Sequence, residues 1–183
     1  MLKHSLVATF IAIASSFAFL GCSTAPKSDT AKEDLSNDAQ TELNRLKRDD
    51  PSLESFLNNA YAYAIFPSVG KGGVGIGGAY GHGVVYQGGQ LIGYADLRQA
   101  TVGLQLGGQT YTELLAFENK EALDRFKSNS FAFSANASAV AIKSGAAATA
   151  KYDNGVAVFT SPRGGLMFEA SIGGQEFTYT PKQ

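Results

Sequence analysis

One segment sets the fold class of this chain: Gly70-Lys71-Gly72-Gly73-Val74-Gly75-Ile76-Gly77-Gly78-Ala79-Tyr80-Gly81-His82-Gly83. It contains the G-x-G-x-x-G spacing of dinucleotide-binding loops twice, starting at Gly70 and at Gly73. Such a loop needs a helix directly after the glycines, because the amino terminus of that helix holds the pyrophosphate. Here residues 84–87, Val-Val-Tyr-Gln, follow and are typical of a strand. The segment therefore predicts a β-strand and disfavours a nucleotide site.

The predicted strand has two unlike faces. Larger side chains alternate along one of them: Val74, Ile76, Tyr80 and His82. The opposite face carries only glycine and Ala79, and a face without side chains allows another backbone or a ligand to approach closely. We expect packing against another backbone as the main use of this face. A phosphate held by Lys71 beside the amides of Gly72 and Gly73 stays open as a second interpretation.

Alternation with a period of two extends to both sides of this segment. The further predicted strands span residues 61–66, 90–94, 100–106, 111–117, 131–142, 155–159, 165–172 and 177–179. The tripeptide Gly-Gly-Gln occurs at 88–90, 107–109 and 173–175, each time between two strand-like runs. Paired glycines supply the positive φ angles of tight hairpins, so the pattern predicts an antiparallel meander with a turn at each tripeptide.

Helical spacing of apolar residues is found in three short segments. The first spans residues 35–48 and ends before Asp50, which can cap a second helix over residues 51–60. The third spans residues 120–127, with Asn119 as its cap. Mixed charges on the first two helices favour packing on the sheet over contact with a membrane. The predicted fold class is α+β: a mainly antiparallel, barrel- or sandwich-like meander with two N-terminal helices and one short internal helix.

The amino terminus has the layout of an exported protein that carries a lipid. Lys3 precedes an apolar run over residues 6–20, which is typical of a secretory signal and too short for a comfortable membrane span. The only cysteine, Cys22, follows directly, and the junction resembles the lipobox of bacterial lipoproteins. Ser23 resembles the sorting pattern for delivery to the outer membrane. An ordinary signal peptide with an incidental cysteine is the alternative.

These boundaries divide the chain into a lipoprotein signal peptide (residues 1–21), a flexible tether (22–33) and one domain (34–183). A remainder of about 160 residues fits a single domain. The formal net charge of −1 supplies no positive field for nucleic acid. Attraction to an anionic surface must therefore come from a local arrangement of Lys and Arg.

Catalysis has few candidate residues. Without the leader the only histidine is His82, and acylation would block Cys22. No cluster of residues has the spacing of metal ligands, so we expect no metal, no cofactor and no enzyme activity. A hydrolase in which His82 acts with Asp96 and a serine is kept as a third hypothesis.

The order of motifs resembles a known family. Residues 62–81 contain Ala-Ile-Phe-Pro followed by the glycine-rich strand, residues 100–109 hold a G-x-Q-x-G-like strand, and residues 115–123 lead into the short helix. This series is similar to the SYLF domain of yeast and animal endocytic adaptors, plant FYVE proteins and many bacterial lipoproteins. The similarity covers about residues 51–180.

The resemblance implies a domain that binds phospholipid, with phosphoinositide-type headgroups favoured in eukaryotic members and actin binding reported for some. We therefore predict an outer-membrane-anchored, non-catalytic lipoprotein that binds phospholipid or anionic headgroups. The candidate headgroup residues are Lys71, Gly72, Gly73, Lys47, Arg48, Lys143, Lys151 and Arg163. The alternative is a structural or adaptor protein of the cell envelope that binds another protein, with membrane affinity only from the lipid on Cys22.

Overall fold

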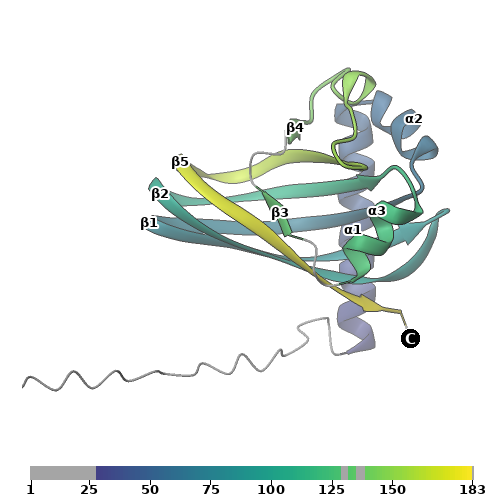
Figure 1. The fold of residues 1–183 in the computed structure, drawn as a ribbon, viewed down its shortest axis with the longest axis horizontal. Helices are drawn as coiled ribbons and strands as arrows, with labels where there is room; N and C mark the ends of the chain where they lie inside the picture. The colour runs from purple at the N-terminus through teal and green to yellow at the C-terminus, as the bar shows by residue number, and fades with distance from the viewer. Residues whose placement is uncertain (1–27, 129–131, 135–138, 183) are drawn as a thin grey trace, which may run out of the picture.

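Three very long antiparallel strands form the body of the protein (Figure 1). The computed structural model describes residues 28–128, 132–134 and 139–182; the predicted signal peptide and Cys22 lie outside them. The elements are α1 (Asp29–Asp49), α2 (Ser52–Asn59), β1 (Ala62–Gln87), β2 (Gln90–Phe117), α3 (Lys120–Lys127), β3 (Ala132–Ser134), β4 (Val140–Ala141), a 3-10 helix (Ala147–Thr149) and β5 (Val156–Pro181). The sheet order is β1-β2-β5-β3, and β4 pairs in parallel with β5. The predicted α+β class is confirmed.

The three long strands bend at their midpoints, so that the sheet folds back on itself into two layers (Figure 1). In β1 the register shifts between Val74 and Ile76, where Gly75 has φ +70°. Only glycine adopts this region without steric cost. The neighbouring bend in β2 contains Gly103 and Gly107, which also have positive φ. Glycine on adjacent strands thus lets the whole sheet turn at one place.

Two of the three predicted Gly-Gly-Gln turns are wrong. Gly88 and Gly89 do form the tight turn between β1 and β2, with φ of 56° and 78°. The copies at 107–109 and 173–175 lie within β2 and β5, and their residues stay paired with neighbouring strands. The strands that the sequence predicts on either side of these two copies are therefore parts of one long strand each, β2 or β5. The physical reason is that the glycines of one strand face those of the next, for example Gly73 beside Gly107, so all strands bend together and none needs to end.

The side-chain-free face of the glycine segment is filled by the first half of the same strand. A β-carbon added at Gly83 would lie 2.6 Å from Phe66 Cδ1, and one added at Gly81 would lie 2.9 Å from Val69 Cγ2. Both separations are shorter than van der Waals contact allows. This confirms close packing as the use of that face at Gly81 and Gly83, against these side chains and against the carbonyl oxygens of Ser68 and Ile65.

The space between the layers holds the first of two apolar cores. Its largest side chains are aromatic and fully buried: Phe66, Phe117, Phe126 and Phe177. Phe126 comes from α3, which begins at the predicted cap Asn119, whose side chain accepts a hydrogen bond from Ala122 N. The helix predicted over residues 120–127 is confirmed to the residue.

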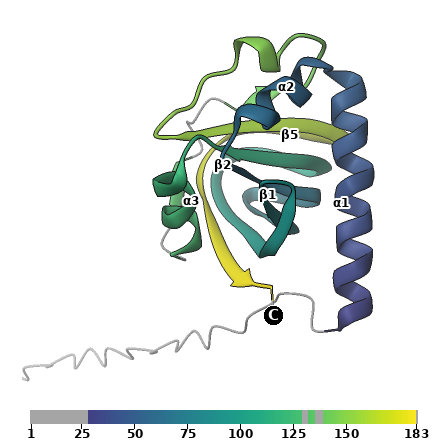
Figure 2. The same ribbon diagram turned by 90° about the vertical axis from the view of Figure 1, so that its right-hand side faces the viewer.

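The second core lies between the sheet and the two N-terminal helices. Leu43 and Leu46 of α1 and Leu53 and Leu57 of α2 pack there against strand residues including Ile65. The predicted packing of these helices on the sheet is confirmed; Figure 2 shows α1 standing alongside the curled strands. With Ser28 as its cap, α1 starts at Asp29, so residues 29–33, which the sequence assigns to the tether, are helical.

The two ends of the described chain lie near each other. Asp29 and Lys32 in the first turns of α1 line the same surface groove as Lys182, next to Leu91 and Tyr94. Figure 1 shows α1 beginning close to the carboxyl terminus, far from the bend of the long strands. The bend and the chain ends therefore occupy different parts of the molecule.

Candidate functional site

Large apolar side chains are exposed where the sheet bends. Val74 and Ile76 of β1 are 75% and 74% exposed, and Val102 and Leu106 of β2 are 66% and 63% exposed. The register places Val74 beside Leu106 and Ile76 beside Val102, so the four form one contiguous cluster. We call these four residues the apex. In Figure 1 the apex end of the sheet lies opposite the helices.

The strand geometry explains why the apex faces outward. A β-carbon at Gly73 would collide with the backbone of Ile76 and Gly77, so at this bend only glycine fits on the inner side. Alternation then places Val74 and Ile76 on the outer side. The apolar residues of α1 and α2 pack elsewhere, against strand residues such as Ile65 and Leu114. Four aliphatic side chains are thus left in water, which is a costly arrangement for a monomer without a partner surface.

Polar side chains lie in the space between the two layers of the sheet, on the face opposite to the one that carries the apex side chains. Glu113 of β2 sits between Thr112 and Leu114, which face α1, so its own side chain faces the interlayer space; it is 1% exposed. Gln175 Nε2 of β5 donates a hydrogen bond of 2.9 Å to Glu113 Oε2. Glu113 Oε1 has no hydrogen-bond partner among the described residues.

The protonation of Glu113 is set by this burial. Desolvation raises the pKa of Glu113 to about 7, although hydrogen bonds from Gln175 and Tyr111 and the charge of Lys71 act in the opposite direction. A neutral carboxyl group costs much less in an apolar interior than an ionised one. Glu113 therefore changes charge near neutral pH, inside the sheet.

His82 and Asp96 are brought together, as the hydrolase hypothesis requires. Nδ1 of His82 lies 2.7 Å from Oδ1 of Asp96, and the hydroxyl of Tyr80 lies 3.2 Å from Nε2 of the same ring. Asp96 is buried and His82 is partly exposed on the outer face of the sheet. The ring nitrogen that would activate a serine therefore faces a tyrosine hydroxyl. Among the described residues, no cluster of three His, Cys, Asp or Glu side chains is placed to hold a metal ion.

The predicted basic residues are spread over the molecule. Lys47 and the exposed Arg48 lie in the last turn of α1, and Lys47 Nζ lies 3.3 Å from Glu54 Oε1. Lys143 and Lys151 are exposed on either side of the 3-10 helix that packs on α2. These four residues lie at the end of the molecule opposite the apex, where the helices pack, and we call this the helical end. Only Lys71, with its neighbours Gly72 and Gly73, is close to the apex, where it is half-buried.

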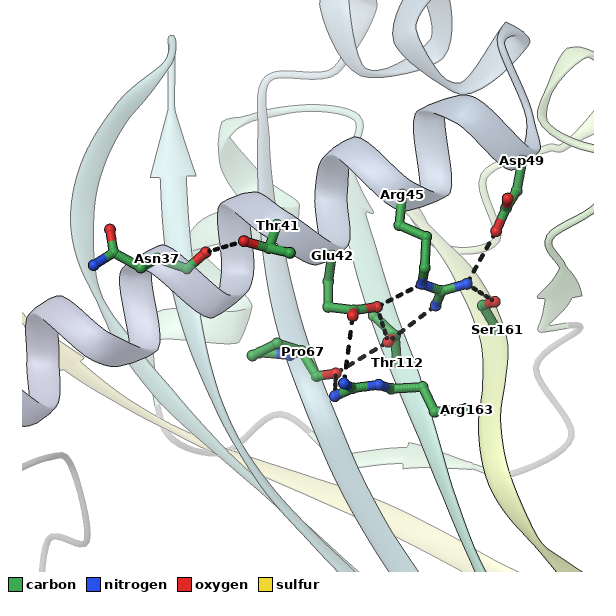
Figure 3. Close-up of polar contacts among 9 residues, drawn as sticks. All are labelled: Asn37, Thr41, Glu42, Arg45, Asp49, Pro67, Thr112, Ser161 and Arg163. Atoms are coloured by element: carbon green, nitrogen blue, oxygen red, sulfur yellow. Dashed lines mark hydrogen bonds and ion pairs between the residues drawn. The ribbon is translucent and has the colours of Figure 1, made fainter.

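Arg163, the eighth predicted headgroup residue, belongs to a structural network under α1 (Figure 3). Its guanidinium donates to Pro67 O at 2.9 Å and lies 3.5 Å from Glu42. Glu42 also accepts from Arg45 at 2.8 Å and from Thr112 at 2.9 Å. Burial opposes the ionisation of Glu42, but these hydrogen bonds and the two arginine charges outweigh it and lower its pKa.

Sequence reasoning missed the apex and Glu113. Val74 and Ile76 are visible as an apolar face of the glycine segment, but alternation alone does not say whether such a face is covered. Val102 and Leu106 look like ordinary core positions, because only the bend removes them from the core. A glutamate in the predicted strand 111–117 carries no signal of burial. Within the described part of the chain, no helix is long and apolar enough to cross a bilayer.

Comparison with known proteins adds two similarities. Residues 98–181 match the Ysc84 family, described as "Las17-binding protein actin regulator". The chain is 31% identical to Beta cell expansion factor A of Aeromonas veronii over 154 residues, and this match covers 81% of the chain. The chain in turn spans 58% of the length of that relative.

Proposed function

Since this chain carries a Ysc84-type (SYLF) domain, we propose that it binds the phospholipid surface of a membrane through the apex, without catalysis. The observation that carries the proposal is the exposure of four large aliphatic side chains on two paired strands. Exposed apolar clusters of this kind mark membrane or protein contacts. The candidate cations give less support, because most of them lie at the helical end or in the network beneath α1.

The size of the apex predicts weak binding by the domain alone. Burying one exposed Val, Leu or Ile side chain is worth about 1.5–3 kcal/mol, so four contribute roughly 6–12 kcal/mol. Association costs an estimated 4–15 kcal/mol in lost freedom of motion. The two figures are of similar size. Lasting attachment then requires a second contribution, which an acylated Cys22 would supply.

We further propose that Cys22 carries this lipid and that the protein is delivered to the outer membrane of a bacterial envelope. The support is the leader, the lone cysteine and Ser23. Metabolic labelling with palmitate tests the anchor: the wild-type protein should incorporate label and fractionate with outer membranes, and Cys22→Ala should do neither. Equal labelling of both proteins would remove the anchor from the proposal.

Liposome co-sedimentation tests the domain itself, using the processed chain with Cys22→Ser so that no acyl chain contributes. The protein should sediment with phospholipid vesicles, and the double variant Val74→Ser/Ile76→Ser should not. The matched control is Lys143→Ser/Lys151→Ser, two exposed changes at the helical end, which should bind as the parent does. Circular dichroism should show the same sheet content in all three. Equal binding by the apex variant would refute the proposed surface.

A protein partner is the second candidate function, because the description of the matching family names binding to a protein. An envelope adaptor would show no affinity for vesicles and would recover a stoichiometric partner in a pull-down.

A lipid esterase is the third candidate function. This candidate predicts that the parent protein hydrolyses lipid esters and that His82→Ala does not. A parent protein without this hydrolysis would refute the esterase.

A further inference from the structure

The apex carries little charge of its own. In the described part of the bend, the nearest cations are Lys71, three positions before Val74, and Arg98, four positions before Val102. Lys71 is half-buried, and its charge is near enough to the interior to help lower the pKa of the buried Glu113. A surface that recognised anionic headgroups would instead present clustered cations toward the lipid. The charges described in this region therefore do not complement an anionic membrane.

The area of the apex also limits what can cover it. Among the described side chains of the bend, the four exposed aliphatic ones amount to a patch on the order of 400 Å², which is about half of the ~800 Å² that each partner contributes to a stable protein interface. A second copy of this chain would gain too little from the apex alone. A fluid layer of acyl chains has no such minimum, because it can enclose a small apolar projection from all sides.

The shape of the apex is that of a narrow wedge. Three strands bend together there, so two layers of the sheet meet at one end of the molecule (Figure 1). Glycine lines the inner side of the bend, and the aliphatic side chains project from its outer side. A shallow aliphatic wedge, whose four apex residues carry no charge, inserts best where the headgroups are already spread apart.

We infer that the apex recognises acyl chains exposed at packing defects of a strongly curved bilayer, rather than anionic headgroups. This inference rests on the proposed function and specifies the property of the membrane that the same surface reads. It gives the four apex residues the selective role that the sequence assigns to Lys71 and the other cations.

Vesicle size and vesicle charge, varied independently, test the inference. The processed chain with Cys22→Ser is mixed with phosphatidylcholine vesicles of about 30 nm or about 200 nm diameter, at equal total lipid. A third sample contains about 200 nm vesicles with added phosphatidylglycerol. We expect at least about tenfold tighter binding to the small neutral vesicles than to the large ones, with less than about a twofold change when NaCl is raised from about 0.1 M to about 0.5 M. Val74→Ser/Ile76→Ser should abolish the preference for small vesicles, and the Lys143→Ser/Lys151→Ser control should keep it.

The remaining outcomes are distinguishable. Binding only to phosphatidylglycerol vesicles, lost at high salt, would overturn the inference and leave the proposed membrane binding in place. So would binding that depends on the apex but not on vesicle diameter. No binding to any vesicle would overturn the proposed function together with the inference. If the free protein formed a dimer and Val74→Ser/Ile76→Ser dissociated it, the apex would be assigned to a second copy of this chain. That result would overturn the proposed function and the inference.

Discussion

Glu113 is the residue whose environment differs most from that of an ordinary surface carboxylate. It is enclosed between two layers of one sheet, one of its oxygens accepts a hydrogen bond from Gln175, and the other has no described partner. An unsatisfied buried polar atom costs about 1–3 kcal/mol, more if it is charged. The fold therefore favours the neutral acid over the carboxylate, and the stability of the protein becomes dependent on pH near neutrality.

Replacing Glu113 by Gln should remove this dependence. The folded-state pKa of about 7 lies above the ordinary value of 4.5, so the stabilising effect of the neutral form is complete below pH 4.5 and is lost as the pH rises through about 7. The free energy of unfolding of the wild type should fall by up to about 3 kcal/mol over this interval, at about 1.4 kcal/mol per unit of pKa. Glu113→Gln should stay nearly flat and exceed the wild type at pH ~8.

Urea unfolding at a series of pH values measures this difference. Glu176→Gln, which removes an exposed carboxylate from the adjacent strand β5, is the control and should follow the wild-type curve. The lowered pKa values of Glu42 and Asp50 act in the opposite direction and only below about pH 4.5, so they leave the tested interval clear. Parallel curves for wild type and Glu113→Gln would show that Glu113 is not the titrating group.

At the scale of single elements, the strands depend on glycine at specific places and tolerate change at others. Gly83 packs directly on Phe66 and on the backbone of Ile65, whereas nothing lies within 4 Å of a β-carbon added at Gly70. Gly83→Ala should therefore destabilise the protein by about 1–3 kcal/mol through overpacking. Gly70→Ala should be neutral or slightly stabilising, because it restricts the unfolded chain. Thermal unfolding of both variants checks this, and equal melting temperatures would mean that the two halves of β1 are not in contact.

Helix α1 depends on a polar network as well as on its leucines (Figure 3). The hydroxyl of Thr112 lies 2.9 Å from Glu42 Oε2 and 3.0 Å from the carbonyl oxygen of Pro67, and it is fully buried. Thr112→Val keeps the shape and should cost about 1–3 kcal/mol, because it removes a donor from a buried carboxylate. Thr41→Val, on the exposed face of α1, should change stability by less than about 0.5 kcal/mol. Chemical denaturation that gave both variants the same midpoint would contradict a stabilising role for the network.

Local signals predicted the helices well and the strands only in part. Asn119 and the spacing of Leu123 and Phe126 define α3 because a cap and an apolar face are properties of a few neighbouring residues. The glycine pairs at 107–108 and 173–174 have the composition of turns, yet they lie inside strands. Whether such a pair ends a strand or bends it depends on which residues lie beside it in the sheet. That is a property of pairing between distant segments, which sequence spacing does not contain.

At the scale of the whole molecule, the apex and the helical end are far apart. About twelve residues of extended strand separate the bend from either end of β1, a distance of roughly 40 Å at about 3.3 Å per residue. The proposed membrane contact would therefore leave the helices in water. The second core under α1 begins closer to the bend, at Ile65 and Val84, but about nine residues of strand, roughly 30 Å, still separate the two, so apex variants should not disturb that core.

A label at each end tests this orientation. In a Cys22→Ser background, an environment-sensitive fluorophore on Val102→Cys should shift to shorter wavelength when vesicles are added, because the probe enters an apolar medium. The same fluorophore on Asp153→Cys, in the exposed turn before β5, should keep its emission. A shift at both positions would mean that the domain lies flat on the bilayer, and a shift at Asp153→Cys alone would reverse the orientation.

The groove shared by Asp29, Lys32 and Lys182 has a consequence for how the chain is connected. Because these residues are neighbours, a short linker can join Lys182 to the start of α1, and the chain can be opened elsewhere by circular permutation. The turn at Gly88 and Gly89 is the natural opening, since it is exposed and two residues long. In such a permutant β1 and β2 would no longer be joined by a local hairpin and would have to find each other across nearly the full chain. The same sheet should then form more slowly, which would separate the stability of this fold from the speed at which it is reached.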